Sequence, residues 1–272
     1  MHNAAFAALG LNWRYLALEV DPKNLAAAIA GARAMHFAGL NLTVPHKLLA
    51  MDLVDELDVS AKTWGAVNTI RFDVQSSKSE TQSHQPGEVR AVGFNTDADG
   101  LANSLREDLA VELLGAKVVL LGAGGAGRTA ALKLAAEKVA EIFLVNRTAS
   151  KAEEIAGEIK KQFPAVKVST GYPKTGVDLL VNATSLGLKM EDRLPLDEKQ
   201  FPLQQARAVY DMIYQPAETK LLAAARVAGC PTANGVGMLV QQGAKAFAIW
   251  TGQPAPVAVM RRAVEGSVYG KQ

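Results

Sequence analysis

Short apolar runs alternate with segments of helical spacing through the middle of this 272-residue chain. The apolar run at 117–121 ends in a glycine-rich turn, an Ala- and Leu-rich helical pattern covers 128–138, and a second apolar run follows at 141–145. Apolar runs of this length are typical of strands that are buried on both faces of a sheet. A strand, glycine turn, helix and strand within about 30 residues predict a βαβ unit.

The same alternation continues toward the C-terminus. Strands are predicted at 166–169, 177–182 and 207–211, with helices at 149–162 and 217–228. This order predicts a parallel sheet with helices on both faces. After about residue 230 the strand signal disappears, and two helices are predicted at 236–251 and 256–266.

The first hundred residues alternate less regularly. Strands are predicted at 14–20, 39–43, 67–74 and 89–94, and helices at 3–9, 22–37, 46–57 and 97–110. The polar, Ser-rich stretch at 76–87 cannot bury enough apolar surface to order itself, so we expect a mobile hairpin tip without a functional role. A domain boundary is predicted within the helix at 97–110.

Composition excludes several classes of function. The chain has 29 Lys and Arg against 27 Asp and Glu, so its net charge of +2 predicts no nucleic-acid partner. The single cysteine, Cys230, and four scattered histidines predict neither a disulfide framework nor a metal site. No apolar run approaches the roughly 18 residues of a membrane span, and no basic leader precedes an apolar segment. We therefore expect a soluble, cytoplasmic, two-domain metabolic protein.

The spacing Gly122-x-Gly124-x-x-Gly127 has a direct physical use. The first glycine makes a tight turn, the second lets a pyrophosphate approach the backbone, and the helix N-terminus offers unpaired N–H groups to that anion. A glycine turn before a helix also occurs for purely structural reasons. Its position between a strand and a helix favours a dinucleotide site.

The residues after the second strand bear on which dinucleotide binds. An NAD site calls for Asp or Glu there, whereas this chain has Asn146-Arg147-Thr148, with Lys151 one turn further. Arginine pairs with phosphate and stacks on adenine, so the pattern favours NADP. The alternative is that Arg147 and Lys151 only solvate a helix start.

Polar side chains also gather at three strand ends in the first hundred residues. These are the stretches NLTVPHK at 41–47, GAVNT at 65–69 and GFNTDADG at 93–100. Lys47 begins a predicted helix, at the end where the helix dipole disfavours a cation, which is a small cost unless the ammonium has a task. Asp97 alone would be interpreted as an N-cap. Together the three stretches suggest a shared pocket at one sheet edge.

These motifs, followed in order by LGAGGAG, NRT, NATSLGL, DMIYQPAET and NGVGMLVQQGAKAFAIW, resemble those of the shikimate dehydrogenase family from Met1 almost to the C-terminus. The resemblance implies an α/β fold of two lobes. Residues 1–100 would form a substrate domain, 101–238 a doubly wound, Rossmann-type NADP domain with a parallel sheet, and helices in 239–272 would return to the substrate lobe. It also implies reversible, NADPH-dependent reduction of 3-dehydroshikimate to shikimate, a step of aromatic amino-acid (chorismate) biosynthesis, by a monomer or homodimer.

The resemblance also assigns roles to residues. Lys47 would be the catalytic lysine and Asp97 its partner, and Thr43, Asn68, Tyr214 and Gln242 would bind substrate. Pyrophosphate would lie against Gly122, Ala123, Gly124, Gly125 and Ala126, and the adenosine 2′-phosphate against Asn146, Arg147, Thr148 and Lys151. The ribose and nicotinamide would lie against Asn182, Thr184, Met212 and Gly235. No metal is implied.

Two departures from the family accompany this likeness. The family carries a first strand and a Ser-x-Ser-Pro segment, which binds the substrate carboxylate, just before the Met-His-Asn motif, whereas this sequence opens at Met1-His2-Asn3. The expected explanations are a misassigned start, a truncation, or a divergent protein with weak carboxylate binding. Trp64 replaces a compact aliphatic residue, either altering the pocket wall or packing in the core.

Three alternatives stay open at this point. A quinate or dual quinate/shikimate dehydrogenase shares the fold, although NAD preference would go with an acid where Asn146-Arg147-Thr148 stands. The missing serines support a second hypothesis, a non-catalytic ligand-sensing homologue, whereas retention of Lys47 and Asp97 argues against it. A methylenetetrahydrofolate dehydrogenase-like protein fits the VPHK and NTD motifs poorly.

Overall fold

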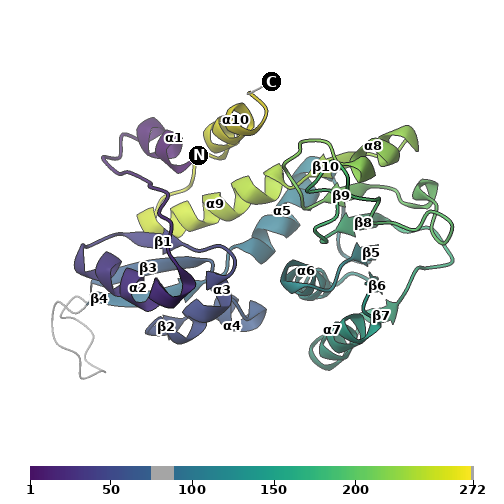
Figure 1. Cartoon of the computed structure of the whole chain (residues 1–272), viewed down its shortest axis with the longest axis horizontal. Helices are drawn as coiled ribbons and strands as arrows, with labels where there is room; N and C mark the ends of the chain where they lie inside the picture. The colour runs from purple at the N-terminus through teal and green to yellow at the C-terminus, as the bar shows by residue number, and fades with distance from the viewer. Residues whose placement is uncertain (75–88, 271–272) are drawn as a thin grey trace. The chain divides into compact units, whose positions relative to one another are not determined.

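The computed structural model describes residues 1–74 and 89–270, and the stretch expected to be a mobile hairpin tip, 76–87, lies outside them (Figure 1). The chain divides into two compact units, which are described separately. The N-terminal unit comprises residues 2–97 and 243–256, and the central unit comprises residue 1, 98–242 and 257–272. The domain limits 1–100, 101–238 and 239–272 stay a prediction. No helix within 1–74 and 89–270 is long and apolar enough to cross a membrane.

The central unit is built on a six-stranded parallel sheet, as the alternating pattern predicts. Its strand order is β10-β9-β8-β5-β6-β7. The strands are β5 (Lys117–Leu121), β6 (Glu141–Val145), β7 (Lys167–Thr170), β8 (Leu179–Asn182), β9 (Val209–Asp211) and β10 (Thr232–Asn234). Since the order reverses between β5 and β8, the carboxyl ends of these two strands flank the place where such sheets bind ligands.

The helices of the central unit are α5 (Asp97–Leu109), α6 (Gly125–Ala136), α7 (Ala149–Gln162), α8 (Lys220–Val227), α9 (Val236–Thr251) and α10 (Val257–Val268), with a 3₁₀ turn, η3 (Leu203–Gln205). Helices α5 and α9 run across the division between the two units. One face of the sheet is covered by a fully buried cluster that includes Val119, Leu180, Phe201 and Leu222.

The N-terminal unit has a smaller, mixed sheet with the order β1-β3-β4-β2. Its strands are β1 (Gly39–Asn41), β2 (Glu56–Leu57), β3 (Thr69–Val74) and β4 (Val89–Phe94), of which β3 is antiparallel to β1 and β4 while β2 is parallel to β4. Its helices are α1 (His2–Ala8), α2 (Leu25–Ala34), α3 (His46–Leu49) and α4 (Val59–Trp64), with 3₁₀ turns η1 (Pro22–Asn24) and η2 (Ala50–Asp52).

Two predicted elements differ in the structure, and two short elements were not predicted. The predicted strand at 14–20 has no ladder partner among the described residues, and Leu16 and Leu18 are exposed. An apolar alternation becomes a strand only where a neighbouring backbone supplies hydrogen bonds, and β1 pairs with β3. The predicted helix 46–57 breaks into α3, η2 and β2. The helix α4 and the strand β10 were not predicted, because each is too short for a clear hydrophobic period.

An aromatic cluster joins α1 to the end of α9 within the N-terminal unit. The rings of His2 and Tyr15 stack with centroids 4.5 Å apart, and Phe6 stacks on Phe247 at 5.4 Å. Trp250 Nε1 donates a hydrogen bond to the backbone oxygen of Ile70 (2.9 Å), so α9 is tied to β3. His2 is fully buried, and burial lowers its pKa from the ordinary 6.5 to about 4.

The side chain of Trp64 was expected either to alter the pocket wall or to pack in the core. Trp64 is buried, as expected of core packing.

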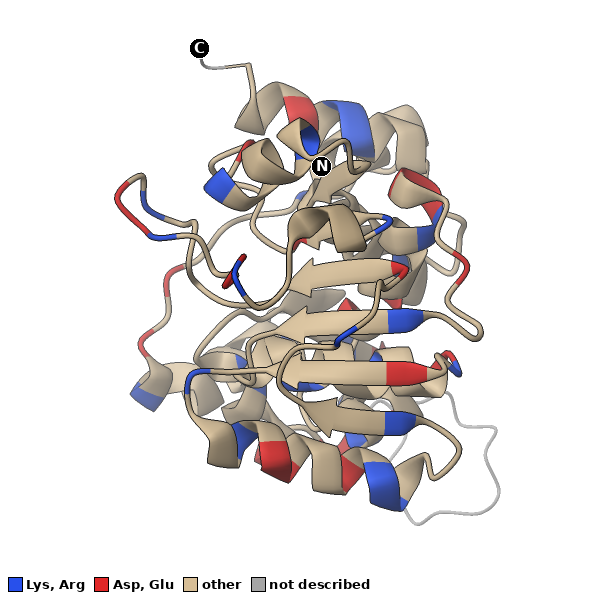
Figure 2. Cartoon of the chain, turned by 90° about the vertical axis from the view of Figure 1, so that its right-hand side faces the viewer, with Lys and Arg blue, Asp and Glu red and all other residues tan. Residues whose placement is uncertain are grey.

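Positions of Lys and Arg are interspersed with positions of Asp and Glu in the view of Figure 2. Any attraction for an anionic ligand must therefore come from individual side chains placed near it.

Candidate active site

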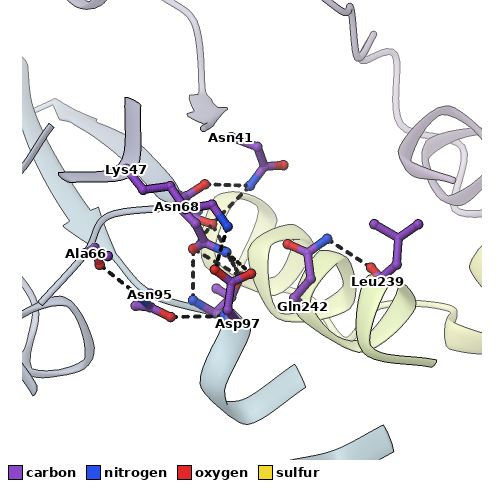
Figure 3. Close-up of polar contacts among 10 residues, drawn as sticks. Asn41, Lys47, Ala66, Asn68, Asn95, Asp97, Leu239 and Gln242 are labelled. Carbon is purple, nitrogen blue, oxygen red and sulfur yellow. Dashed lines mark hydrogen bonds and ion pairs between the residues drawn. The ribbon is translucent and has the colours of Figure 1, made fainter. Parts of the chain in front are cut away.

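The N-terminal unit brings together two of the three polar strand ends at one ion pair. Lys47, in the first turn of α3, approaches Asp97, the first residue of α5, with 2.7 Å between Nζ and Oδ2 (Figure 3). The two side chains are 26% and 17% exposed. A carboxylate at hydrogen-bond distance fixes the ammonium, and partial exposure keeps both groups within reach of a small molecule.

Asn68 connects this ion pair to the buried sheet edge. Its Nδ2 donates to Asp97 Oδ1 (2.9 Å) and to Thr96 Oγ1 (2.9 Å). Its Oδ1 accepts from the Thr96 backbone N–H (2.9 Å) and from Thr69 Oγ1 (3.0 Å). The amide orientation of Asn68 is thus set from the core, and it holds the second oxygen of Asp97 in place.

Two asparagines that our sequence reasoning did not single out complete this arrangement. Asn95, 1% exposed, accepts the Asp97 backbone N–H on Oδ1 (3.1 Å) and donates from Nδ2 to the Ala66 backbone oxygen (3.0 Å). Asn41 donates to Thr69 Oγ1 (3.0 Å) and to the Asn68 backbone oxygen (3.2 Å). The signal was present in NLTVPHK and GFNTDADG, but asparagine is also a common turn residue. We call Asn41, Asn68, Thr69, Asn95, Thr96 and Asp97 the Asn68 network.

The remaining residues predicted to bind substrate lie on other segments. Thr43 is exposed in the turn before α3, where its backbone oxygen accepts the His46 N–H (2.8 Å). Tyr214 is 38% exposed in the segment that follows β9, and Gln242 on α9 donates from Nε2 to the Leu239 backbone oxygen (2.9 Å). Tyr214 and Gln242 belong to the central unit, so their approach to a substrate stays a prediction.

The glycine turn of the central unit is tightly packed at Gly122 and Gly127 and open in front of α6. Gly122 directly follows β5 with φ +104°, and a Cβ there would lie 3.0 Å from the backbone of Ala183. A Cβ on Gly127 would clash with the Gly122 carbonyl, so the third glycine lets α6 pack against the turn. Apart from their chain neighbours and the backbone of α6 itself, nothing in the described part of the chain lies within 4 Å of the Cβ positions of Gly124 and Gly125. The start of α6 is therefore open to an anion.

The stretch after β6 contributes both structure and exposed cations. Asn146 accepts the Ala123 N–H on Oδ1 (3.1 Å) and donates to the Thr148 backbone oxygen (2.8 Å), so it binds the glycine turn to the end of β6. Arg147, Thr148 and Lys151 are exposed. The chain thus offers two positively charged side chains after β6, Arg147 before α7 and Lys151 in its first turn.

The four residues expected near ribose and nicotinamide lie beyond the carboxyl ends of β8, β9 and β10. Asn182 ends β8 and is fully buried, and Thr184 follows in the next turn. The Met212 backbone N–H donates to the Asn182 oxygen (3.0 Å), and the Gly235 N–H donates to the Ile213 oxygen (3.1 Å). These segments therefore form one hydrogen-bonded group at the same sheet edge as the glycine turn.

Within residues 1–74 and 89–270, no three His, Cys, Asp or Glu side chains are grouped so as to hold a metal ion. Cys230 is buried with its thiol 3.3 Å from the backbone oxygens of Leu203 and Ala206, and burial raises its pKa. The N-terminal unit thus offers an ammonium–carboxylate pair, and the central unit by itself offers a glycine turn with an open helix start.

Comparison with known families gives matches along most of the chain. The substrate binding domain of shikimate dehydrogenase matches residues 1–70, the shikimate / quinate 5-dehydrogenase family matches 104–185, and the C-terminal domain of shikimate 5′-dehydrogenase matches 235–265. The three matches fall in the order in which the sequence motifs occur.

Individual relatives agree over nearly the whole chain. Shikimate dehydrogenase (NADP(+)) of Methanopyrus kandleri is 43% identical, covering 97% of this chain and 89% of the relative. A crystal structure of a shikimate dehydrogenase in complex with NADP+ has a TM-score of 0.84 at 37% identity, covering 98% of this chain and 89% of that one. Quinate dehydrogenase from Corynebacterium glutamicum, in complex with NAD, has a TM-score of 0.80 at 29% identity and covers 97% and 92%.

Proposed function

Because this chain belongs to the shikimate dehydrogenase family, we propose that it catalyses the reversible, NADP-dependent interconversion of 3-dehydroshikimate and shikimate. The observation that carries the proposal is the ion pair of Lys47 and Asp97, held from the core by Asn68 and placed where a small molecule can reach it. A quinate/shikimate dehydrogenase that prefers NAD is less well supported, because no acid follows β6.

NADPH, when bound, supplies the hydride that reduces the substrate carbonyl. The protein then has to orient the substrate and deliver one proton to the oxygen. Lys47 donates that proton and its charge stabilises the developing alkoxide, while Asp97 holds the ammonium and accepts a hydrogen bond from the substrate hydroxyl. In the oxidation of shikimate the neutral lysine amine takes the proton back. Thr43, Asn68, Tyr214 and Gln242 hold the ring substituents in this proposal.

The residues of the central unit fit NADP. The space before α6 accommodates a pyrophosphate at Gly124 and Gly125, and Arg147 and Lys151 are the cations that pair with the adenosine 2′-phosphate. We further infer a cytoplasmic protein that acts as a monomer or homodimer and has no nucleic-acid partner. Sedimentation of the purified chain over a range of concentrations tests the oligomeric state.

A steady-state assay tests the proposal directly. The purified chain is supplied with shikimate or quinate, each with NADP+ or NAD+, and cofactor reduction is followed by absorbance. We expect turnover with shikimate and NADP+ to exceed the other three combinations. Faster turnover of quinate with NAD+ would replace the proposal with the dual-specificity alternative. Calorimetric binding of shikimate without any turnover would identify a ligand sensor.

A further inference from the structure

The central unit contains a buried carboxylate to which the proposed chemistry gives no role. Asp211 ends β9 and is fully buried. Its three hydrogen-bond donors are all neutral: Asn182 Nδ2 and the Ile213 backbone N–H reach Oδ1 at 3.0 Å each, and Thr219 Oγ1 reaches Oδ2 at 2.7 Å. A carboxylate in such a position loses its hydration, and burial raises its pKa. An apolar residue would fill this place at lower cost, so the charge calls for an explanation.

The three donors come from three different segments of the chain. Asn182 is at the end of β8, Ile213 is in the turn after β9, and Thr219 caps α8 by accepting the Leu222 N–H (3.3 Å). In the sheet, Asn182 and Asp211 are register partners, and Asp211 is in turn the partner of Asn234 on β10. Asp211 therefore lies at the centre of a polar row across the carboxyl edge of the sheet.

The contact to Asn182 extends to the loop that follows β8. Because Asn182 Nδ2 points to Asp211, its Oδ1 faces the loop and accepts both the N–H (3.0 Å) and the hydroxyl (2.7 Å) of Thr184. Thr184 Oγ1 in turn accepts the Leu186 N–H (3.1 Å). An amide turned the other way would present a donor to these two donors. Asn182 Nδ2 also donates to the Leu186 backbone oxygen (3.2 Å), so the carboxylate of Asp211 and this carbonyl together fix the amide that holds the loop at 182–186.

The turn after β9 is fixed from the same point. With Ile213 held by Asp211, the Ile213 carbonyl accepts the Gly235 N–H, and a Cβ on Gly235 would clash with the Met212 carbonyl. The backbones of Met212 and Gly235 are therefore packed in direct contact. We call Asn182, Thr184, Asp211, Ile213 and Thr219 the Asp211 network.

We propose that Asp211 is a positioning residue for hydride transfer, which holds the loops carrying Thr184, Met212 and Gly235 in the arrangement that receives the nicotinamide ring. This inference rests on the proposed function, because that function places the nicotinamide at these loops. Asp211 itself touches neither cofactor nor substrate. The adenosine 2′-phosphate is expected against Arg147 and Lys151, which share no hydrogen bond with the Asp211 network within the described residues. Loss of the carboxylate should therefore disturb binding of the nicotinamide more than binding of the adenosine half.

Saturation-transfer difference NMR of NADP+ on the full chain tests this separation without requiring turnover. In Asp211→Asn we expect the nicotinamide proton signals to fall at least threefold relative to the adenine signals, with the Kd for NADP+ changed less than threefold. With shikimate, kcat should fall about 10- to 100-fold, as for loss of alignment of reacting groups. The kinetic isotope effect with shikimate deuterated at the oxidised carbon should increase, because hydride transfer becomes slower relative to product release.

The control is Asp192→Asn, whose carboxylate accepts the backbone N–H groups of Gly187 and Lys189 in the adjacent loop. It should retain the nicotinamide-to-adenine ratio and kcat of the unchanged protein. A normal ratio and normal isotope effect in folded Asp211→Asn would overturn the inference. An unchanged protein that binds NADP+ but oxidises no shikimate would count against the proposed function instead, and the NMR ratio would still judge the role of Asp211.

Thr219 supplies a second variant pair in case Asp211→Asn does not fold. Thr219→Val removes one donor to Asp211 while keeping the side-chain shape, and Thr219→Ser restores the hydroxyl. We expect Thr219→Val to lower the nicotinamide ratio and kcat severalfold, and Thr219→Ser to recover both to within twofold. Equal behaviour of the two variants, whether both are normal or both are impaired, would overturn the inference.

Discussion

The two units each contain a buried polar network at a sheet edge, and the networks end differently. The Asn68 network reaches the surface, because its last member, Asp97, pairs with the partly exposed Lys47. In the Asp211 network the carboxylate itself is enclosed: each partner of Asp211 within the described residues is a buried amide, backbone N–H or hydroxyl, and the half-buried Thr184 is reached only through Asn182. A network with an open end can take part in proton transfer, whereas a closed one acts only by fixing the backbone around it.

The position of a side chain within a network determines whether its substitution should affect activity alone or stability as well. Substitution of Lys47, at the exposed end of the Asn68 network, should remove proton transfer and leave the fold intact. Substitution of a buried member of the network should lower both turnover and stability, since a buried donor or acceptor loses its partner.

Lys47→Ala removes the open end of the Asn68 network. We expect kcat to fall by about 10²- to 10⁴-fold, the range that a general acid contributes, with the KM for shikimate nearly unchanged. Lys62→Ala, an exposed lysine on α4, is the matched control and should keep normal turnover. Near-normal turnover in Lys47→Ala would remove this residue from the mechanism.

Arg147→Ala tests whether the exposed arginine after β6 binds the adenosine 2′-phosphate of NADP+. A lost charge-assisted hydrogen bond of about 1.5–3 kcal/mol corresponds to a rise of roughly 10- to 150-fold in the KM for NADP+, with the KM for NAD+ little changed. Lys160→Ala, at the far end of α7, serves as the control. If the KM values for both cofactors rise together in Arg147→Ala, the residue binds a part that the two cofactors share.

Asn95→Ala breaks the network behind the open end. It leaves the Asp97 N–H and the Ala66 carbonyl without their side-chain partner, so we expect a loss of about 1–3 kcal/mol in the free energy of unfolding together with a roughly tenfold lower kcat. Chemical denaturation and steady-state kinetics measure the two effects. A variant that loses stability but keeps full kcat would show that Asn95 supports the fold without aligning Asp97. The exposed Asn12→Ala should change neither quantity.

Burial of His2 predicts a pH dependence of the free energy of unfolding. The folded chain keeps His2 neutral until about pH 4, whereas the unfolded chain protonates it near 6.5. The free energy of unfolding should therefore fall as pH drops through this window, by up to about 3 kcal/mol. His2→Phe should flatten this part of the profile, while His36→Asn, at an exposed histidine, should leave it unchanged. Parallel profiles for His2→Phe and the unchanged protein would contradict the assignment.

The sequence predicted the central unit well because β5, β6 and β8 each contain an unbroken run of at least three apolar residues and α7 has a clear helical period. It failed where tertiary contacts decide the outcome. The apolar alternation at 14–20 matches a strand, yet a strand needs a neighbour to pair with. The strand β2 has only two residues and β10 only three, and such lengths carry no measurable period.

The candidate site likewise contains residues that the sequence indicated and residues that it did not. The three polar strand ends indicated a shared pocket, and the family resemblance then assigned roles to Lys47, Asp97 and Asn68, which the structure brings together in hydrogen-bond contact. Asn95 and Asp211 were missed, because a buried amide or acid near a turn has the same appearance in sequence as an ordinary cap. Only burial, together with the number of partners that each satisfies, distinguishes them from caps.

The N-terminal unit is completed by residues 243–256, which carry Phe247 and Trp250. During synthesis the ribosome must therefore translate nearly the whole chain before Phe6 and the Ile70 carbonyl gain these partners. The part of the chain that is made first is the part whose packing is finished last. A nascent chain stalled soon after α5 should remain protease-sensitive at α1, and protection should appear only after the end of α9 has left the exit tunnel.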